Sequence, residues 1–233
     1  GTCYNSPVIQ AARYHFVTPN TLYVRDDDVT DMNSPPTRGE YMETVLSDAD
    51  RPHEVWNILD PMDTGTNDVR GAPNLAKMEE YGTVIWSTGS AMGILDAANV
   101  ADLSSYLDGF GNLWIHGEEV ATDLAASQPT FLTNYLHAAH GTDPVSPPYM
   151  NGVAGDPITG AWSATQLLFA GLSPDNVDPD VGGITMLYYP GTNSAGVRAD
   201  HDLDSRVVTM GQNYFQGTDA LTRRTTTVSY THL

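Results

Sequence analysis

The run LDGFGNLWIHGEE, residues 107–119, decides how the rest of the sequence is interpreted. Its apolar residues Leu113, Trp114 and Ile115 are typical of a short buried strand, and the glycines before them predict a turn out of a helix. Gly117, Glu118 and Glu119 then predict a sharp turn at the end of that strand. Open α/β sheets place their functional groups at the carboxyl ends of strands. This turn is therefore the first candidate site, although it carries two carboxylates and no nucleophile.

Strands and helices alternate around this run. Strands are predicted at 21–25, 54–58, 83–86 and 113–115, and helices at 39–50, around Leu75 and Met78, at 96–107 and at 130–139. This alternation predicts a flavodoxin-like, doubly wound α/β fold, with a mainly parallel sheet, the Leu113 strand central, and helices on both faces. Residues 141–183 are rich in Pro, Gly and Asp. Strands predicted at 184–189, 196–198 and 206–210 then form a β-rich C-terminal segment.

Composition excludes several classes of function. The chain has 233 residues and a net charge of −19, from 29 acidic and 10 basic side chains. Such a surface repels nucleic acid and anionic membranes. No apolar run approaches the roughly 18 residues that a membrane-spanning helix needs, so no membrane insertion is expected. The single cysteine, Cys3, excludes an internal disulfide and a cysteine metal cluster.

The two ends of the sequence differ from its middle. Residues 1–20 are polar and irregular and are predicted to be a linker from an upstream region, whereas residues 21–227 are expected to form one domain. We expect a longer parent chain whose signal peptide lies outside this sequence. Residues 228–233, VSYTHL, resemble a translated sequencing adapter and are expected to be a non-native tail.

Several segments, taken in order, resemble a known group of domains. They are LYVRDDD at 22–28, VIWSTG at 84–89, LSSYLDGFGNLWIHGEE at 103–119, FLTNYLH at 131–137 and GVAGDPI at 152–158. Together they resemble domains with the class I glutamine amidotransferase-like fold that occur inside large secreted bacterial and archaeal proteins. These domains are similar in architecture to ThuA-like domains and to the trimerisation domain of some β-galactosidases. The resemblance covers about residues 20–220 and rests on order and spacing.

The resemblance implies a fold without its usual catalytic groups. Amidotransferases place a cysteine at the turn in a Gly-x-Cys-x-Gly context, but residues 117–121 read GEEVA, with Glu119 at the thiol position. Their late His-x-Glu pair matches GQNYF at 211–215, which has no histidine. The thioester route is therefore unavailable, and no catalytic residue is predicted.

The implied function is that of an accessory or interaction domain in an extracellular or cell-surface protein, with the neighbouring domains of the parent protein as partners. A metal-dependent hydrolase and a carbohydrate-binding module are the alternatives.

The hydrolase alternative depends on an acidic edge of the sheet. Asp26, Asp27 and Asp28 end the first strand, and Glu118 and Glu119 end the central one. If these five carboxylates meet, they offer the oxygen ligands that Ca²⁺ or Mg²⁺ requires. The interpretation favoured on sequence is different: some of these acids cap helix N-termini and the others face solvent, so that no cofactor is needed.

Two further sets of residues have metal-ligand spacing. Asp200, Asp202 and Asp204 are spaced as in a calcium loop, but the glycine and glutamate that such loops carry further on are missing. A solvated hairpin tip is favoured for them. His137 and His140 are three residues apart at the C-terminal end of the helix predicted at 130–139, with Asp143 beyond, which is a possible zinc spacing. The favoured interpretation is a pair of histidines that interact with the C-terminal dipole of that helix.

Overall fold

The computed structural model describes residues 20–26, 38–58, 71–89, 95–143, 149–160, 165–166, 174–191, 193–201 and 205–212. The elements are, in chain order, β1 (Thr21–Arg25), α1 (Arg38–Asp48), β2 (His53–Asn57), α2 (Leu75–Met78), β3 (Thr83–Gly89), α3 (Ala97–Asp108), β4 (Asn112–Gly117), α4 (Val120–Ser127), α5 (Pro129–Asn134), β5 (Ala138–His140), β6 (Tyr149–Gly152), β7 (Thr165–Gln166), β8 (Val177–Pro179), β9 (Ile184–Tyr188), β10 (Ser194–Asp200) and β11 (Arg206–Met210). The predicted linker and tail lie outside the described residues, apart from Asn20.

A nine-stranded sheet runs through the molecule in the order β2-β1-β3-β4-β11-β10-β9-β6-β7. The first five of these strands pair in parallel. Their order is the flavodoxin-like one, in which the chain moves outward from β1 in both directions. The predicted fold class is confirmed, and β4 lies inside the parallel part, between β3 and β11.

The C-terminal strands extend the sheet in the opposite sense. β10 pairs antiparallel with β11 and β9, and β6 pairs antiparallel with β9 and β7. β5 and β8 form a separate two-stranded antiparallel sheet. Residues 141–183, for which no strand was predicted, therefore supply β6, β7 and β8. Their Pro and Gly residues divide this segment into pieces too short to show a periodic pattern.

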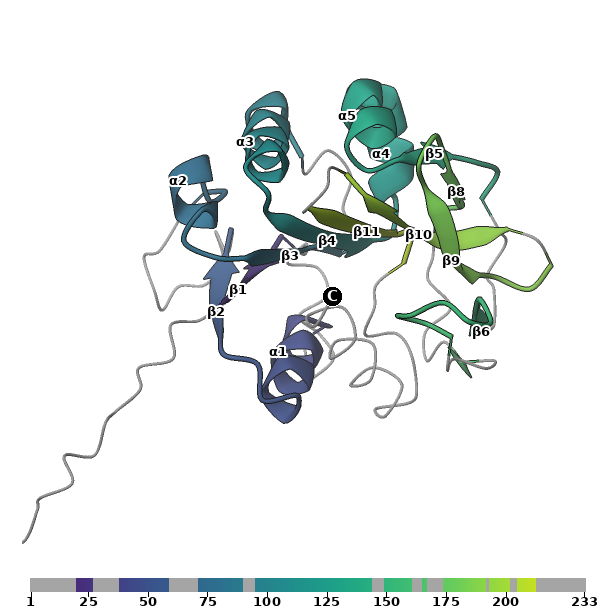
Figure 1. The fold of residues 1–233 in the computed structure, drawn as a ribbon, viewed down its shortest axis with the longest axis horizontal. Coiled ribbons are helices and arrows are strands. Elements are labelled where there is room, and N and C mark those ends of the chain that lie inside the picture. Colours follow the sequence, from purple (N-terminus) through teal and green to yellow (C-terminus); the bar gives the residue numbers. More distant parts are fainter. Residues whose placement is uncertain are drawn as a thin grey trace, which may run out of the picture.

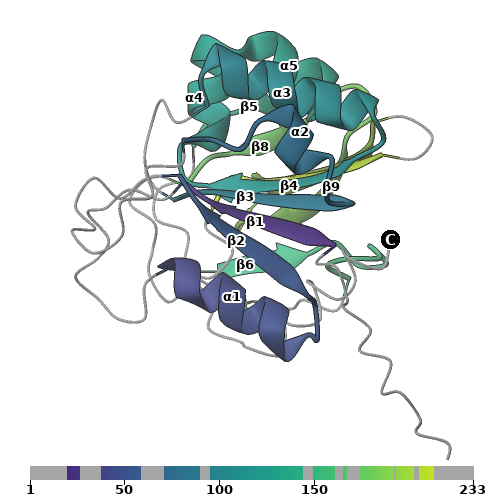
Figure 2. The same ribbon diagram turned by 90° about the vertical axis from the view of Figure 1, so that its left-hand side faces the viewer.

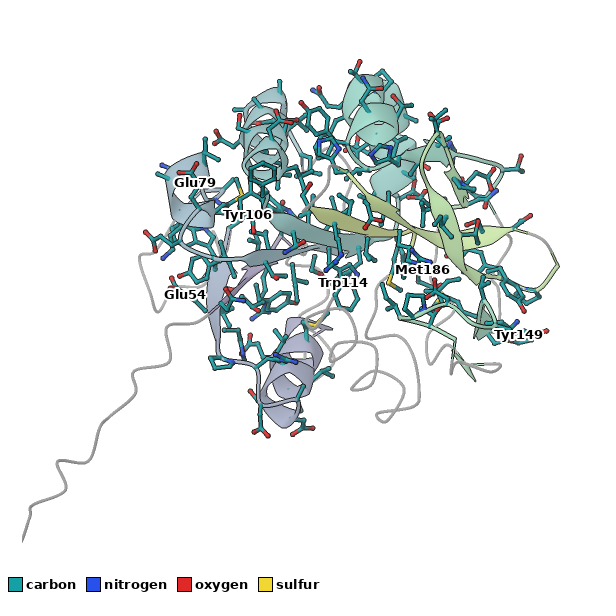
Figure 3. All side chains as sticks on the ribbon, viewed as in Figure 1. Glu54, Glu79, Tyr106, Trp114, Tyr149 and Met186 are labelled. Carbon is teal, nitrogen blue, oxygen red and sulfur yellow. The ribbon has the colours of Figure 1, made fainter. Side chains whose placement is uncertain are left out.

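Two hydrophobic layers hold the helices on the sheet. α2, α3, α4 and α5 lie on one face, and α1 lies on the other (Figures 1 and 2). Alternate residues of one strand enter different layers, since Val84 and Trp86 belong to the first cluster and Ile85 to the second. In Figure 3 Tyr106 lies on the α3 side of the sheet, and Trp114 lies on the α1 side. Trp86 and Trp114 are almost fully buried, as expected for tryptophans in the strands predicted at 83–86 and 113–115.

Local sequence explains one helix boundary well. The Asp96 carboxylate accepts from the Ala98 and Asn99 N–H groups at 2.8 Å each, and the Asn99 side chain returns a bond to the Asp96 N–H, a capping box. Side-chain caps of this kind satisfy N–H groups that have no partner within the helix. The start predicted for this helix is confirmed.

The prediction of a helix at 130–139 is partly wrong. The helix expected at 130–139 ends at Asn134, and residues 138–140 instead form strand β5. Tyr135 is the C-cap residue of this helix. Beyond it, His137 has φ 51°, a left-handed backbone that is incompatible with a continued helix, and its Nδ1 lies 2.7 Å from the Val181 carbonyl oxygen. The helix α4 was not predicted at all. Among the described residues, no helix has the length and apolar character needed to cross a membrane.

Candidate functional site

The turn between β4 and α4, called the elbow here, consists of Gly117, Glu118 and Glu119. Gly117 lies against β3, where a Cβ atom would overlap Thr88 Oγ1 and come within 2.9 Å of the Gly89 carbonyl oxygen. The Glu118 N–H donates to that carbonyl at 2.8 Å. Glu119 has φ 63° and ψ 4°, a left-handed conformation that is unfavourable for a residue with a side chain. The elbow is a tight, strained turn held against the end of β3.

A strand, a strained turn and a helix form the setting in which α/β hydrolases present a nucleophile. The structure places Glu119, the residue at the thiol position of the resemblance, at the left-handed position of this turn. The backbone of a nucleophile elbow is therefore present, and a carboxylate stands where the nucleophile would be.

Asp175 caps the helix that follows the elbow. It is fully buried. One of its oxygens accepts from the Ala121 N–H at 2.5 Å, and the other accepts from the Thr122 hydroxyl at 2.6 Å. Glu119 occupies the N-cap position but makes no side-chain cap bond. The cap of α4 thus comes from a residue 54 positions further along the chain.

Burial raises the pKa of the Asp175 carboxyl from 3.8 to about 7. The hydrogen bonds from Thr122 and Ala121 act in the opposite direction, while the charges of Asp143 and Glu119 raise this pKa further. Asp175, Asp143 and Glu118 also raise the pKa of the buried Tyr189, after burial itself. Several carboxylates therefore converge beside the start of α4.

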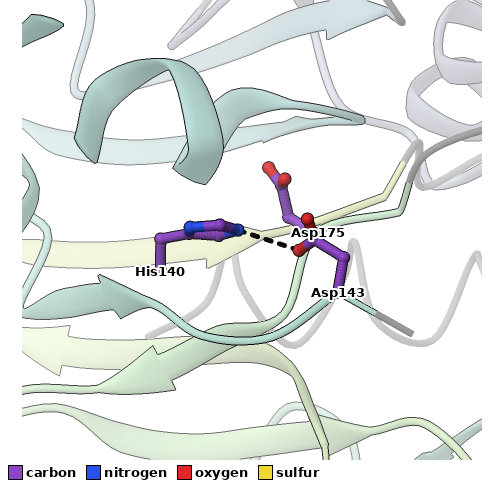
Figure 4. A group of neighbouring side chains, drawn as sticks. All are labelled: His140, Asp143 and Asp175. Carbon is purple, nitrogen blue, oxygen red and sulfur yellow. Dashed lines mark hydrogen bonds and ion pairs between the residues drawn. The ribbon is translucent and has the colours of Figure 1, made fainter. Parts of the chain in front are cut away.

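His140 and Asp143 complete the cluster, which Figure 4 shows together with Asp175. His140 Nε2 lies 2.9 Å from Asp143 Oδ1 and 3.1 Å from Thr122 Oγ1. The Asn176 N–H donates to the same Asp143 oxygen at 3.0 Å. One ligand atom from each of His140, Asp143 and Asp175 lies within 4.8 Å of the others. We call these three residues the His–Asp cluster.

Pairing of β5 with β8 brings the cluster together. His140 is opposite Val177 in this pair, and the Gly141 N–H donates to the Asn176 carbonyl at 3.0 Å. A Cβ atom on Gly141 would overlap the Asn176 side chain, so the close approach depends on glycine. The Asp175 N–H donates to the Gly211 carbonyl at 2.8 Å, which ties the cluster to the end of β11.

This arrangement does not match a nucleophilic triad. In Ser-His-Asp systems the acid holds one imidazole nitrogen and the nucleophile the other. Here Thr122 and Asp143 both contact Nε2 of His140. The buried Asp175 also places a carboxylate at the N-terminus of α4, where an oxyanion would otherwise be stabilised by helix N–H groups. Acyl transfer at the elbow is therefore disfavoured, because the Ala121 N–H that could stabilise an oxyanion already bonds to Asp175.

The residues predicted for the acidic edge are only partly visible. The Asp26 carboxylate accepts from the Trp86 indole N–H at 3.1 Å, and Asp27 and Asp28 lie outside the described residues. Glu118 is buried and Glu119 is half-buried. Among the residues that the structure describes, the three-ligand group contains none of these acids. The alternative of a Ca²⁺ or Mg²⁺ site at this edge stays a prediction. The favoured interpretation does not hold for Glu118, which is buried away from solvent, or for Glu119, which makes no side-chain cap bond.

The other two metal predictions have different outcomes. Asp200 is exposed and lies 3.7 Å from the Arg206 guanidinium, while Asp202 and Asp204 are outside the described residues. The placement of His137 and His140 on one helix is wrong. His137 instead lies 3.4 Å from His201 through their ring nitrogens, and His140 joins the His–Asp cluster from β5.

Sequence reasoning missed Thr122 and Asp175 as site residues. Asp175 comes from the Pro-, Gly- and Asp-rich segment 141–183, for which no element was predicted, and Thr122 comes from the helix α4, which was not predicted. No spacing motif links residues 122, 140, 143 and 175, because three separate segments supply them.

Comparison with known proteins identifies the fold. No protein-family model and no curated protein match the chain. A ThuA-like protein from Bacteroides uniformis ATCC 8492 is 12% identical, with 95% of this chain and 93% of that chain covered, at a TM-score of 0.57. A Salmonella typhimurium LT2 protein described as cytoplasmic is 13% identical, with 91% and 98% covered, at 0.61. The mmIFT52 N-terminal domain is 14% identical, with 85% and 88% covered, at 0.56. Likeness at these identities concerns the fold, which is ThuA-like.

The strain at the elbow can be measured by substitution. Glu119→Gly and Glu119→Ala both remove the carboxylate, but only glycine accepts φ 63° without penalty. We expect Glu119→Gly to be more stable than Glu119→Ala by about 1 kcal/mol in urea denaturation. The matched pair Asp123→Gly and Asp123→Ala, inside α4, should give the opposite order by about 1 kcal/mol. An alanine variant at 119 as stable as the glycine variant would contradict a strained turn.

The raised pKa of Asp175 predicts a dependence of stability on pH. The folded state keeps the proton up to about pH 7, whereas the unfolded chain loses it near the ordinary value of 3.8. The stabilisation from this proton is complete below about pH 4 and is lost as the pH rises to about 7. The unfolding free energy of the wild type, minus that of Asp175→Asn, should therefore fall over this range in urea denaturation with EDTA present. A difference that stays constant, or rises, would show that Asp175 titrates normally.

Proposed function

We propose that this chain is a non-catalytic accessory or interaction domain of a larger secreted or cell-surface protein, with the neighbouring domains of that protein as its partners. The observation that carries the proposal is the elbow, where Glu119 holds the left-handed position and buried Asp175 caps the following helix. A carboxylate at both places leaves neither a nucleophile nor a favourable position for an oxyanion.

Context supports the domain role and the extracellular location separately. One similar structure is the N-terminal domain of its protein, so the fold serves there as part of a longer chain. The net charge of −19 suits a solvated surface in saline surroundings. The similar Salmonella protein is described as cytoplasmic. For this reason the proposed location rests on the charge and on the sequence resemblance, and the fold does not contribute to it.

A metal-dependent hydrolase is the second candidate function. The observation that favours it is the His–Asp cluster beside the elbow, which offers three ligand atoms at one place. Such an enzyme would need a metal-bound water as its nucleophile, because the chain supplies none at the elbow. No comparable observation favours the carbohydrate-binding alternative.

The non-catalytic proposal predicts that the protein does not hydrolyse glutamine. Ammonia release from glutamine should be the same for the wild type, for Glu119→Ala and for the matched surface variant Glu80→Ala, because Glu119 is a poor nucleophile toward an amide. The assay should be repeated with added Zn²⁺ and Mn²⁺ and with ester substrates. Turnover by the wild type that disappears in Glu119→Ala would contradict the proposal, and metal-dependent turnover that survives it would favour the hydrolase.

The proposed location predicts where the parent protein is found. In cells that produce it naturally, an antibody against this domain should detect the parent protein in the medium or on intact cells. A cytoplasmic marker protein, followed in the same samples, controls for lysis. Detection only after lysis, together with the marker, would exclude an extracellular or cell-surface role and would leave the catalytic question unchanged.

A further inference from the structure

We propose that His140, Asp143 and Asp175 form a binding site for a divalent transition-metal ion such as Zn²⁺ or Mn²⁺. The inference goes beyond the proposed accessory function and does not depend on it, since a metal ion can stabilise a domain without catalysis. It rests on the donor atoms, on the hydrogen bonds that hold them, on the charge of the cluster and on its access to solvent.

The donor atoms are already close together. One imidazole nitrogen and one oxygen from each carboxyl group lie within 4.8 Å of one another (Figure 4). A zinc ion lies about 2.0–2.2 Å from nitrogen and oxygen ligands, so the ligands of one ion are separated by only a little more than 3 Å. The 2.9 Å between His140 Nε2 and Asp143 Oδ1 is close to that spacing. Small rotations of the three side chains would bring all of them to one ion.

A second layer of hydrogen bonds fixes both carboxylates. The Asn176 N–H holds Asp143, and the Ala121 N–H and the Thr122 hydroxyl hold Asp175. Outer bonds of this kind orient metal ligands and contribute strongly to metal affinity. Two of these three hydrogen-bond donors are backbone N–H groups: that of Ala121, on the first turn of α4, and that of Asn176, next to β8. The ligands are therefore positioned by the fold before any ion binds.

The charge of the cluster calls for a cation. In the part of the chain that the structure describes, His140 is the only basic side chain that contacts Asp143 or Asp175. Asp175 is fully buried, so its charged form is costly unless a positive partner lies beside it. A divalent ion would balance both carboxylates.

The composition of the site selects the class of metal. Ca²⁺ takes six to eight oxygen ligands and Mg²⁺ prefers an octahedron of oxygens. A ligand set of one nitrogen and two carboxylates suits zinc, manganese or iron, and water would complete the coordination. Asp143 is 41% exposed and His140 is 25% exposed, so an ion can reach the cluster from solvent.

The proposal is tested on protein that has been treated with EDTA and then dialysed. Titration with Zn²⁺ in a calorimeter should show saturable binding of one ion per chain, with a rise in melting temperature because the ion binds the folded state. Titration with Co²⁺ should give a visible absorption band, which reports ligands around the metal directly. His140→Gln and Asp143→Asn should each weaken binding by about tenfold or more and remove the band.

Matched controls separate this site from other histidines and acids. His53→Gln and Asp102→Asn, which change residues outside the cluster, should bind as the wild type does. Circular dichroism establishes that each variant is folded, and His140→Gln keeps the test decisive if Asp175→Asn does not fold. Absence of saturable binding to the wild type would overturn the proposal. So would binding that survives His140→Gln but is lost in His137→Gln or His201→Gln, since it would place the metal at the other histidine pair.

Discussion

The bonds from the first turn of α4 to Asp175 are the contacts on which this end of the molecule depends. Helix N-termini carry N–H groups without intrahelical partners and the positive end of the helix dipole. Most helices satisfy them locally, as α3 does through Asp96. In α4 the N-cap residue Glu119 has a left-handed backbone and makes no such bond. A buried carboxylate from the segment before β8 takes its place, and so the elbow, α4 and β8 are joined in one structure.

This cap explains why the C-terminal strands matter to the site. The parallel strands alone would leave α4 uncapped and the end of β4 open. β5 and β8 pair with one another, Asp175 bonds to the end of β11, and Gly141 and Gly211 permit the close approaches. The antiparallel extension is therefore part of the site as well as of the sheet. It brings His140, Asp143 and Asp175 together beside the elbow and the first turn of α4.

The arrangement changes what the elbow can do. A nucleophile elbow works because helix N–H groups and a nearby base stabilise developing negative charge. Here the carboxyl groups of Glu118, Glu119, Asp143 and Asp175 lie around the start of α4. Burial raises the pKa of Asp175 to about 7. Negative charge is already concentrated there, which disfavours an oxyanion and favours a proton or a cation. The backbone of the fold is thus separable from the chemistry that is usually placed on it.

The sequence by itself determined the parallel strands, α3 with its cap, the burial of Trp86 and Trp114 and the absence of a nucleophile at Glu119. These features depend on local patterns: apolar runs bounded by glycine, an Asp before a helix, and the identity of one residue in a turn. Only the tertiary structure decided that the helix after Pro129 stops at Asn134, that His137 turns toward His201, and that His140 meets Asp175. Those outcomes depend on strand pairing between segments about 40 residues apart in a Pro- and Gly-rich stretch, and no short-range pattern records such contacts.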